Sequence, residues 1–156
     1  MYLRELKLVL KEYTFSCIHF NNGLHGWNYD DSSYATSLAM TFDTLAKYCE
    51  KRKLIWASTT PVWTKSEEKT LDAKTDRVRE RNRIAADLAS DRNIVVNDLF
   101  SHVVDRPELF SADGTHFVES GQVKLAKHVT NAILSRENIG TEQSPAGDSP
   151  KAAPEE

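Results

Sequence analysis

The chain has 156 residues, of which 40% are hydrophobic and 28% charged, and its formal net charge is −3. These values are typical of one globular domain with enough apolar residues to bury a core. The acidic balance excludes a general positive field for nucleic acid or an anionic membrane surface, and no apolar run reaches the roughly 18 residues of a membrane span.

The first half of the chain alternates helical and strand patterns. Residues 2–12 carry apolar side chains at helical spacing and predict an amphipathic helix, which a buried strand at 14–20 follows. A loop then runs to about Tyr34, where a second helix begins. The apolar run at 53–63 predicts a second strand that ends in a loop, because Pro61 is incompatible with helix. The apolar positions on one face of the second helix are Leu38, Phe42, Leu45 and Cys49.

The second half continues the alternation. After a polar loop at 64–75 come a third helix at 76–90 and a third strand within 93–100, which runs into a short helical segment. A last helix spans about 119–136. From 137 onward Ser, Pro, Gly, Ala and Glu dominate, and this composition predicts a disordered tail over 137–156. The inward positions expected on the last helix are Val123, Ala126, Val129, Ala132 and Ile133.

This order of elements predicts one α/β domain over 1–136. Apolar strands that alternate with amphipathic helices indicate a parallel sheet covered on both faces. The expected architecture is therefore a flavodoxin-like three-layer αβα sandwich. In open parallel sheets, ligands bind beyond the carboxyl ends of the strands. Polar clusters follow the three strands, at 21–26, at 58–61 and at Asn97 and Asp98.

Several other patterns have structural interpretations. The basic run at 76–83 is interleaved with acidic residues at helical spacing, which favours a solvated helix face over a phosphate-binding patch. Cys17 and Cys49 form no close pair, and both are expected to be small buried residues rather than a disulfide. His19 and His25 are expected to be structural or surface histidines, and His102 and His128 to lie on helical segments and face solvent.

The segment FSADGTHFVESGQ places Asp113 and His116 three residues apart, just before the last helix. In this spacing the carboxylate accepts a hydrogen bond from one imidazole nitrogen while the other nitrogen can face a cavity. These are the orienter and the base of a hydrolytic triad. A capping aspartate beside an exposed histidine is the structural alternative.

Asn21 and Asn22 follow the first strand directly. An asparagine amide can act as an oxyanion-hole donor, which contributes on the order of 10²–10³ in rate. A loop that needs left-handed conformers is the alternative, since Asn and Gly tolerate positive φ. The presence of Asp113 and His116 elsewhere in the chain favours the first interpretation.

The stretches HFNNGLHGW, LIWASTTPV and DGTHFVESGQVKLAKHVTNAI resemble the third strand, the fourth strand and the C-terminal block of SGNH (GDSL-type) hydrolases, particularly the subgroup related to carbohydrate esterases. The resemblance runs from about Tyr13 to Arg136. It implies that Asp113 and His116 are catalytic and that Asn21 is the oxyanion donor.

This resemblance also implies a reaction and departs from the family pattern at two positions. The expected reaction is removal of acyl groups, mainly acetyl from carbohydrate, through a serine ester and without a metal or organic cofactor. Phe20 stands where the family has glycine, and Asn22 where an aspartate is more usual. A one-residue slip of the comparison would select Asn22 as the donor.

The family's Gly-Asp-Ser turn and its second oxyanion glycine have no counterpart in this sequence. Ser16 lies within the expected first strand, Ser58 lacks a nucleophile-elbow pattern and Ser111 shares the loop of Asp113. We therefore expect an N-terminally truncated SGNH domain that is inactive alone, because loss of the nucleophile removes nearly all of a triad's effect. The strand at 14–20 would become an open edge, so we expect either a fragment of a longer reading frame or cover by a partner or by the N-terminal helix.

The sequence is also compatible with two other kinds of site. A non-catalytic binding or interaction module would keep the pocket without the chemistry. A metal site can be assembled on paper from Asp98, His102, Asp113 and His116, but the ligand spacing typical of a metalloenzyme is missing.

Overall fold

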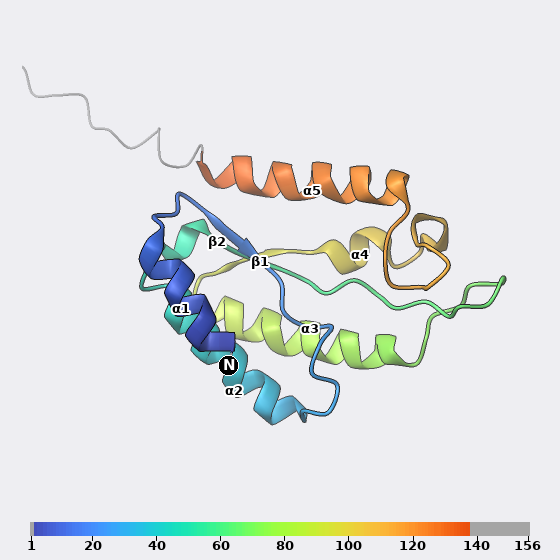
Figure 1. The fold of residues 1–156 in the computed structure, drawn as a ribbon, viewed down its shortest axis with the longest axis horizontal. Helices are drawn as coiled ribbons and strands as arrows, with labels where there is room; N and C mark the ends of the chain where they lie inside the picture. The colour runs from blue at the N-terminus through green and yellow to red at the C-terminus, as the bar shows by residue number, and fades with distance from the viewer. Residues whose placement is uncertain (1, 138–156) are drawn as a thin grey trace, which may run out of the picture.

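A parallel sheet lies between two layers of helices in the computed structural model, which describes residues 2–137 (Figure 1). The elements in chain order are α1 (Tyr2–Glu12), β1 (Ile18–Phe20), α2 (Asp31–Leu45), η1 (Lys51–Lys53), β2 (Leu54–Ala57), α3 (Lys74–Ser90), β3 (Val95–Asn97), α4 (Leu99–Val103), η2 (Pro107–Leu109) and α5 (Glu119–Glu137). On one side of the sheet lie α1, α2 and α3, and α5 lies on the other. The predicted three-layer α/β architecture is confirmed. The tail expected over 137–156 falls, beyond its first residue, outside the described residues.

The three strands pair in the order β1-β2-β3, and every pair is parallel. Ile18 lies opposite Leu54, and Ile55 lies opposite Val95. The first strand is shorter than the predicted 14–20, because only residues 18–20 have a partner on β2. Within the described sheet β1 is an edge strand, as expected, and pairs on one side alone.

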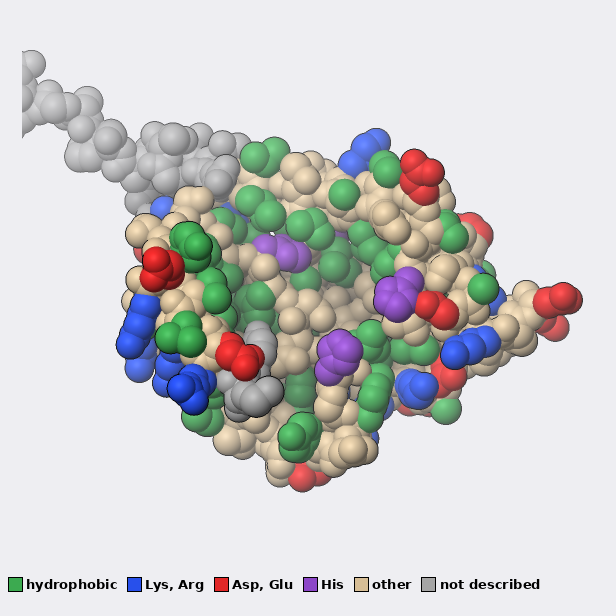
Figure 2. Space-filling model, viewed as in Figure 1, with side chains coloured by type: hydrophobic (Ala, Val, Ile, Leu, Met, Phe, Trp, Pro, Cys, Tyr) green, Lys and Arg blue, Asp and Glu red, His purple; other side chains and the backbone are tan. Residues whose placement is uncertain are grey.

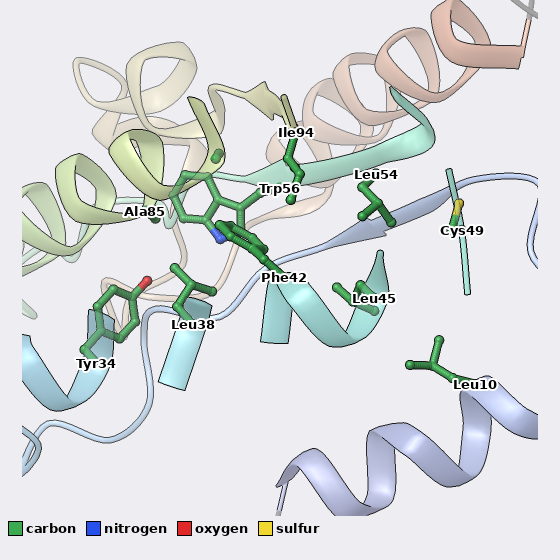
Figure 3. Close-up of a cluster of buried hydrophobic side chains, with 11 residues drawn as sticks. Leu10, Tyr34, Leu38, Phe42, Leu45, Cys49, Leu54, Trp56, Ala85 and Ile94 are labelled. Atoms are coloured by element: carbon green, nitrogen blue, oxygen red, sulfur yellow. The ribbon is translucent and has the colours of Figure 1, made fainter. Parts of the chain in front are cut away.

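The main core fills the space between the sheet and the helices α2 and α3. Trp56 of β2 and Phe42 of α2 are fully buried members of this cluster (Figure 3). The burial of Phe42 follows from the sequence pattern, because apolar residues three, four or seven positions apart share one face of a helix. All four positions predicted to face inward on the second helix are buried: Leu38, Phe42, Leu45 and Cys49.

The N-terminal helix packs beside the edge strand. Leu10 is buried in the main core and Leu6 packs against it, whereas Val9 is 50% exposed. Residues of α1, β1 and α2 leave an apolar groove of about 130 Å³ between them. The helix therefore covers part of the sheet's face next to β1. Among residues 2–137, no helix is both long and apolar enough to cross a bilayer.

The last helix is rotated relative to its predicted orientation. Of the five positions expected to face inward, Val129, Ala132 and Ile133 are half-buried, whereas Val123 is 53% exposed and Ala126 is exposed too. The buried residue is Gly121, where an added Cβ would lie 2.4 Å from the Leu109 carbonyl oxygen. This close backbone approach turns the face that carries Leu125 toward the protein. Hydrophobic side chains gather beneath α5 on the visible face of the molecule (Figure 2).

His19 spans the sheet on the face that carries α5. Its Nε2 atom lies 3.0 Å from the Asn97 side-chain amide nitrogen, which can only donate, so Nε2 is the acceptor. Asn97 is 4% exposed. Burial lowers the pKa of His19 below its ordinary value of 6.5. Protonation would therefore place two donors against each other.

We predict that His19 makes the protein less stable in mild acid. Because its pKa is lower in the folded chain, its contribution is fully present above the unfolded value of 6.5 and is lost as pH falls below it. Urea unfolding at pH 7.5 and at pH 5.0 should show a larger loss for the native chain than for His19→Gln, which keeps an acceptor that does not titrate. Equal losses in the two chains would refute this prediction.

Candidate active site

A tight turn before α5 brings Asp113 and His116 together. His116 Nδ1 lies 2.5 Å from Asp113 Oδ2. The other carboxylate oxygen, Oδ1, accepts hydrogen bonds from the Ser111 hydroxyl at 2.8 Å and from the backbone amides of Thr115 at 2.8 Å and His116 at 2.9 Å. The carboxylate thus holds both the shape of the turn and the orientation of the imidazole.

Those hydrogen bonds also control the charge of Asp113. The bond from the His116 side chain, followed by those from the backbone and Ser111, holds the pKa of Asp113 well below its usual range. The carboxylate is therefore ionised at any ordinary pH and acts as an acceptor for Nδ1. The His116 side chain is 81% exposed, and its Nε2 makes no hydrogen bond with another described residue. The arrangement can orient a base toward a bound molecule, and a catalytic role of the pair stays a prediction.

The turn is anchored on the segment that follows β2. Gly114 has a φ of +74°, and a Cβ there would lie 2.0 Å from the Trp63 carbonyl oxygen. The Trp63 amide donates to the Gly114 carbonyl at 2.8 Å. Lys69 Nζ donates to the carbonyls of Ser111, at 2.9 Å, and Phe110. Glycine at 114 is required both by the positive φ and by the close approach.

The two asparagines have different surroundings. Asn21 Nδ2 donates to the Ala57 carbonyl at 2.7 Å and to Thr59 Oγ1 at 3.0 Å, so both amide protons are engaged. Among residues 2–137, the side chain of Asn22 has no hydrogen-bond partner. It lines a pocket of about 500 Å³ together with His25. An oxyanion bound at Asn21 would have to share or replace its bond to Thr59.

One segment supports both halves of the predicted site. Asn21 is bonded to Ala57 and Thr59, and the His116 turn is bonded to Trp63. Thr59 and Trp63 are four residues apart, so their Cα atoms are separated by at most roughly 14 Å. Both sets of contacts are thus made to the segment 57–63, which begins at the last residue of β2.

The candidate serines are committed elsewhere. Ser58 is 4% exposed, donates to Asp98 Oδ1 at 3.0 Å and accepts from the Phe100 amide at 2.8 Å. Ser111 donates to Asp113. Ser16 precedes β1, which begins only at Ile18. None of the three offers a hydroxyl to Nε2 of His116 in this structure.

The four residues considered for a metal site do not form one in the structure. Among the residues that the structure describes, no group of three or more His, Cys, Asp or Glu side chains could hold a metal ion. His102 instead stacks on His128 of α5, with ring centroids 4.3 Å apart, and both are half-buried. The expectation that these two histidines face solvent was wrong, because α4 and α5 meet at this point.

The basic run on α3 was only partly interpreted correctly. Arg79 and Arg83 are exposed and pair with neighbouring carboxylates, as a solvated face would. Arg81 is 1% exposed, and with Val78 and Ala85 it forms part of the buried stripe of the helix. The spacing of Val78, Arg81 and Ala85 was the signal that could have revealed it.

No protein-family model and no curated protein matches the chain. Solved structures do match its fold. The lipase/acylhydrolase from Enterococcus faecalis is 18% identical with a TM-score of 0.64, and the match covers 86% of this chain and 69% of that one. Axe2, an acetylxylan esterase from Geobacillus stearothermophilus, is 14% identical with a TM-score of 0.62, covering 83% and 66%. An alpha/beta hydrolase from the metagenome of Lake Arreo, Spain, is 12% identical with a TM-score of 0.64, covering 86% and 65%.

These likenesses concern the fold. The chain spans 65–69% of the length of the three structures. The α/β fold expected from the resemblance is confirmed, and it is a fold that a lipase/acylhydrolase and an acetylxylan esterase also have.

Proposed function

We propose that the chain forms the part of a serine-type ester hydrolase that carries the general base and its carboxylate partner. His116 is the base and Asp113 orients it. The observation that carries this proposal is the 2.5 Å contact between His116 Nδ1 and Asp113 Oδ2 beside a free, exposed Nε2. An imidazole held in one tautomer by a carboxylate is the arrangement that activates a hydroxyl nucleophile.

In the proposed reaction, Nε2 takes the proton of a serine hydroxyl as its oxygen attacks the ester carbonyl carbon. The negative charge that develops on the carbonyl oxygen is stabilised by the Asn21 or the Asn22 amide. The imidazolium then gives its proton to the departing alcohol, which leaves an acyl-serine. Water, deprotonated by the same imidazole, releases the acid and restores the serine. These steps need no metal or organic cofactor.

The serine would come from a strand added at the open edge of β1, as the family order of parts implies. For the substrate we propose an acetyl or other short acyl ester on carbohydrate. Support comes from the acetylxylan esterase among the structural neighbours and from the polar side chains of Asn22, His25 and Ser37 around the 500 Å³ pocket.

A binding module is the second candidate. It is favoured by the engagement of both Asn21 amide protons and by the committed hydroxyls of Ser58 and Ser111. Such a module would hold an acylated carbohydrate in the pocket beside Asn22 without cleaving it.

Hydrolysis of 4-nitrophenyl acetate tests the proposal. The chain alone should show no turnover above its His116→Ala variant. A chain with an apolar strand and a Gly-Asp-Ser turn fused before Met1 should gain turnover that His116→Ala removes. Turnover by the chain alone that a serine-directed inhibitor stops would reveal a nucleophile within it and contradict the proposal. Binding of an acetylated xylo-oligosaccharide without turnover in the fused chain would favour the binding module.

A further inference from the structure

Arg81 is a buried cation whose hydrogen bonds go to backbone carbonyls. Its side chain is 1% exposed, and no carboxylate lies within salt-bridge distance of it among the described residues. A buried guanidinium is costly unless its donors are satisfied. The two terminal nitrogens donate to four carbonyls of the loop after β1: Gly23 at 3.0 Å, His25 at 2.9 Å, Gly26 at 2.8 Å and Tyr29 at 3.3 Å, whereas Nε has no acceptor among the described residues.

Aromatic rings complete the surroundings of this guanidinium. Its central carbon lies 5.4 Å from the ring centroid of Trp27 and 4.9 Å from that of Tyr34. Trp27 belongs to the same loop, and the Tyr34 hydroxyl donates to the Asn22 carbonyl at 2.8 Å. Arg81 therefore holds most of residues 22–29, which have no regular structure of their own, and Arg77 of the same helix adds a hydrogen bond to the Tyr29 carbonyl.

The next residue on the helix holds the loop after β2. The Asn82 side-chain amide donates to the Thr59 carbonyl at 2.9 Å, and its oxygen accepts from the Thr59 amide at 2.8 Å. Thr59 is also the residue whose hydroxyl accepts from Asn21. The two loops touch at this point, because a Cβ on Gly23 would lie 2.0 Å from Thr59 Oγ1.

From this network we propose that Arg81 and Asn82, which we call the α3 clamp, are positioning residues for the asparagine amides at 21 and 22. This proposal rests on the proposed function, in which one of these amides stabilises an oxyanion. Donors in such a site work only when they are held in place before the reaction. The clamp supplies that order from the helix, because loops without such anchors are mobile.

The planar fork of arginine is essential to the first half of the clamp. Nη1 serves two carbonyls and Nη2 serves two more, at positions that a single ammonium nitrogen cannot occupy together. Arg81→Lys therefore keeps the charge and loses the geometry. Arg79 provides a matched control on the same helix, since it is exposed and pairs with Asp76 at 2.7 Å.

The test follows amide hydrogen exchange and the Asn21 side-chain NH₂ resonances in the full chain by NMR. In Arg81→Lys, the amides of 23–29 should exchange at least about tenfold faster and the Asn21 resonances should move, while α3 and β2 keep their protection. Asn82→Ala should move the Thr59 and Asn21 resonances, and Arg79→Lys should move none of these.

Unchanged Asn21 resonances in folded Arg81→Lys or in folded Asn82→Ala would overturn the clamp. If Arg81→Lys does not fold, Asn82→Ala decides alone, because its side chain bonds only Thr59 among the described residues. If neither variant folds, the residues hold the whole domain rather than the loops, and the proposal is wrong. These readouts need no turnover, so they stand or fall separately from hydrolysis.

Discussion

In a chain fused to an apolar strand and a Gly-Asp-Ser turn, Asp113→Asn should lower the turnover of an acetyl ester by roughly 10⁴-fold, as the equivalent change does in Ser-His-Asp triads. The turn itself should survive, because the side-chain oxygen that accepts from Ser111, Thr115 and the His116 amide is retained. An NH₂ group in the position of Oδ2 would donate to Nδ1 of His116. The imidazole proton would then sit on Nε2, which could no longer take the proton of the serine.

Ser111→Ala is the matched control for that variant. It removes one donor to Oδ1 and leaves the Oδ2 contact with Nδ1 intact. Loss of one such hydrogen bond costs about 0.5–1.5 kcal/mol, so turnover should fall by no more than about tenfold. Asp113→Asn that stays within tenfold of the parent chain would exclude Asp113 as the orienter of His116.

Trp56→Ala should destabilise the protein by about 3–5 kcal/mol, the usual cost of emptying a large buried site. Trp56 is 0% exposed and lies in the main core with Phe42 and Leu54 (Figure 3). Since small domains unfold with only about 5–15 kcal/mol in all, the variant should be partly unfolded near 37 °C. Urea denaturation followed by circular dichroism measures the difference.

Trp56→Phe separates volume from polarity at the same site. The Trp56 Nε1 group is buried and finds no acceptor among the described residues, so part of the gain from burying the indole is offset. Phenylalanine removes this N–H and keeps most of the apolar surface, so we expect it to cost clearly less than alanine. An unfolding free energy of Trp56→Ala within about 1 kcal/mol of the parent would mean that the core does not depend on this ring.

Local sequence patterns predicted well those helices whose apolar face packs directly against the sheet. The second helix has Leu38, Phe42 and Leu45 in the core, since helical periodicity alone decides which side chains share a face. The orientation of the last helix was predicted less well. Val123 and Ala126 face outward because Gly121 packs on the Leu109 carbonyl, and this contact between distant backbone segments leaves no periodic signal.

In the candidate site, too, contacts between residues near in sequence were predicted and contacts between distant residues were not. Asp113 and His116 were recognisable because three residues separate them, so a single turn brings carboxylate and imidazole together. The bond of Asn21 to Thr59 and the burial of Arg81 among loop carbonyls were not predicted. The partners in these contacts are 38 to 58 residues apart in the chain, and only the register of the parallel sheet brings them together.

The sequence by itself determined the alternation of strands and helices, the parallel sheet and the Asp113–His116 turn, because each depends on spacing within a few residues. The tertiary structure alone decided which amide is engaged, which arginine is buried and which face α5 presents. These depend on how separate segments pack, since a polar group removed from water must find its partner wherever the fold places one.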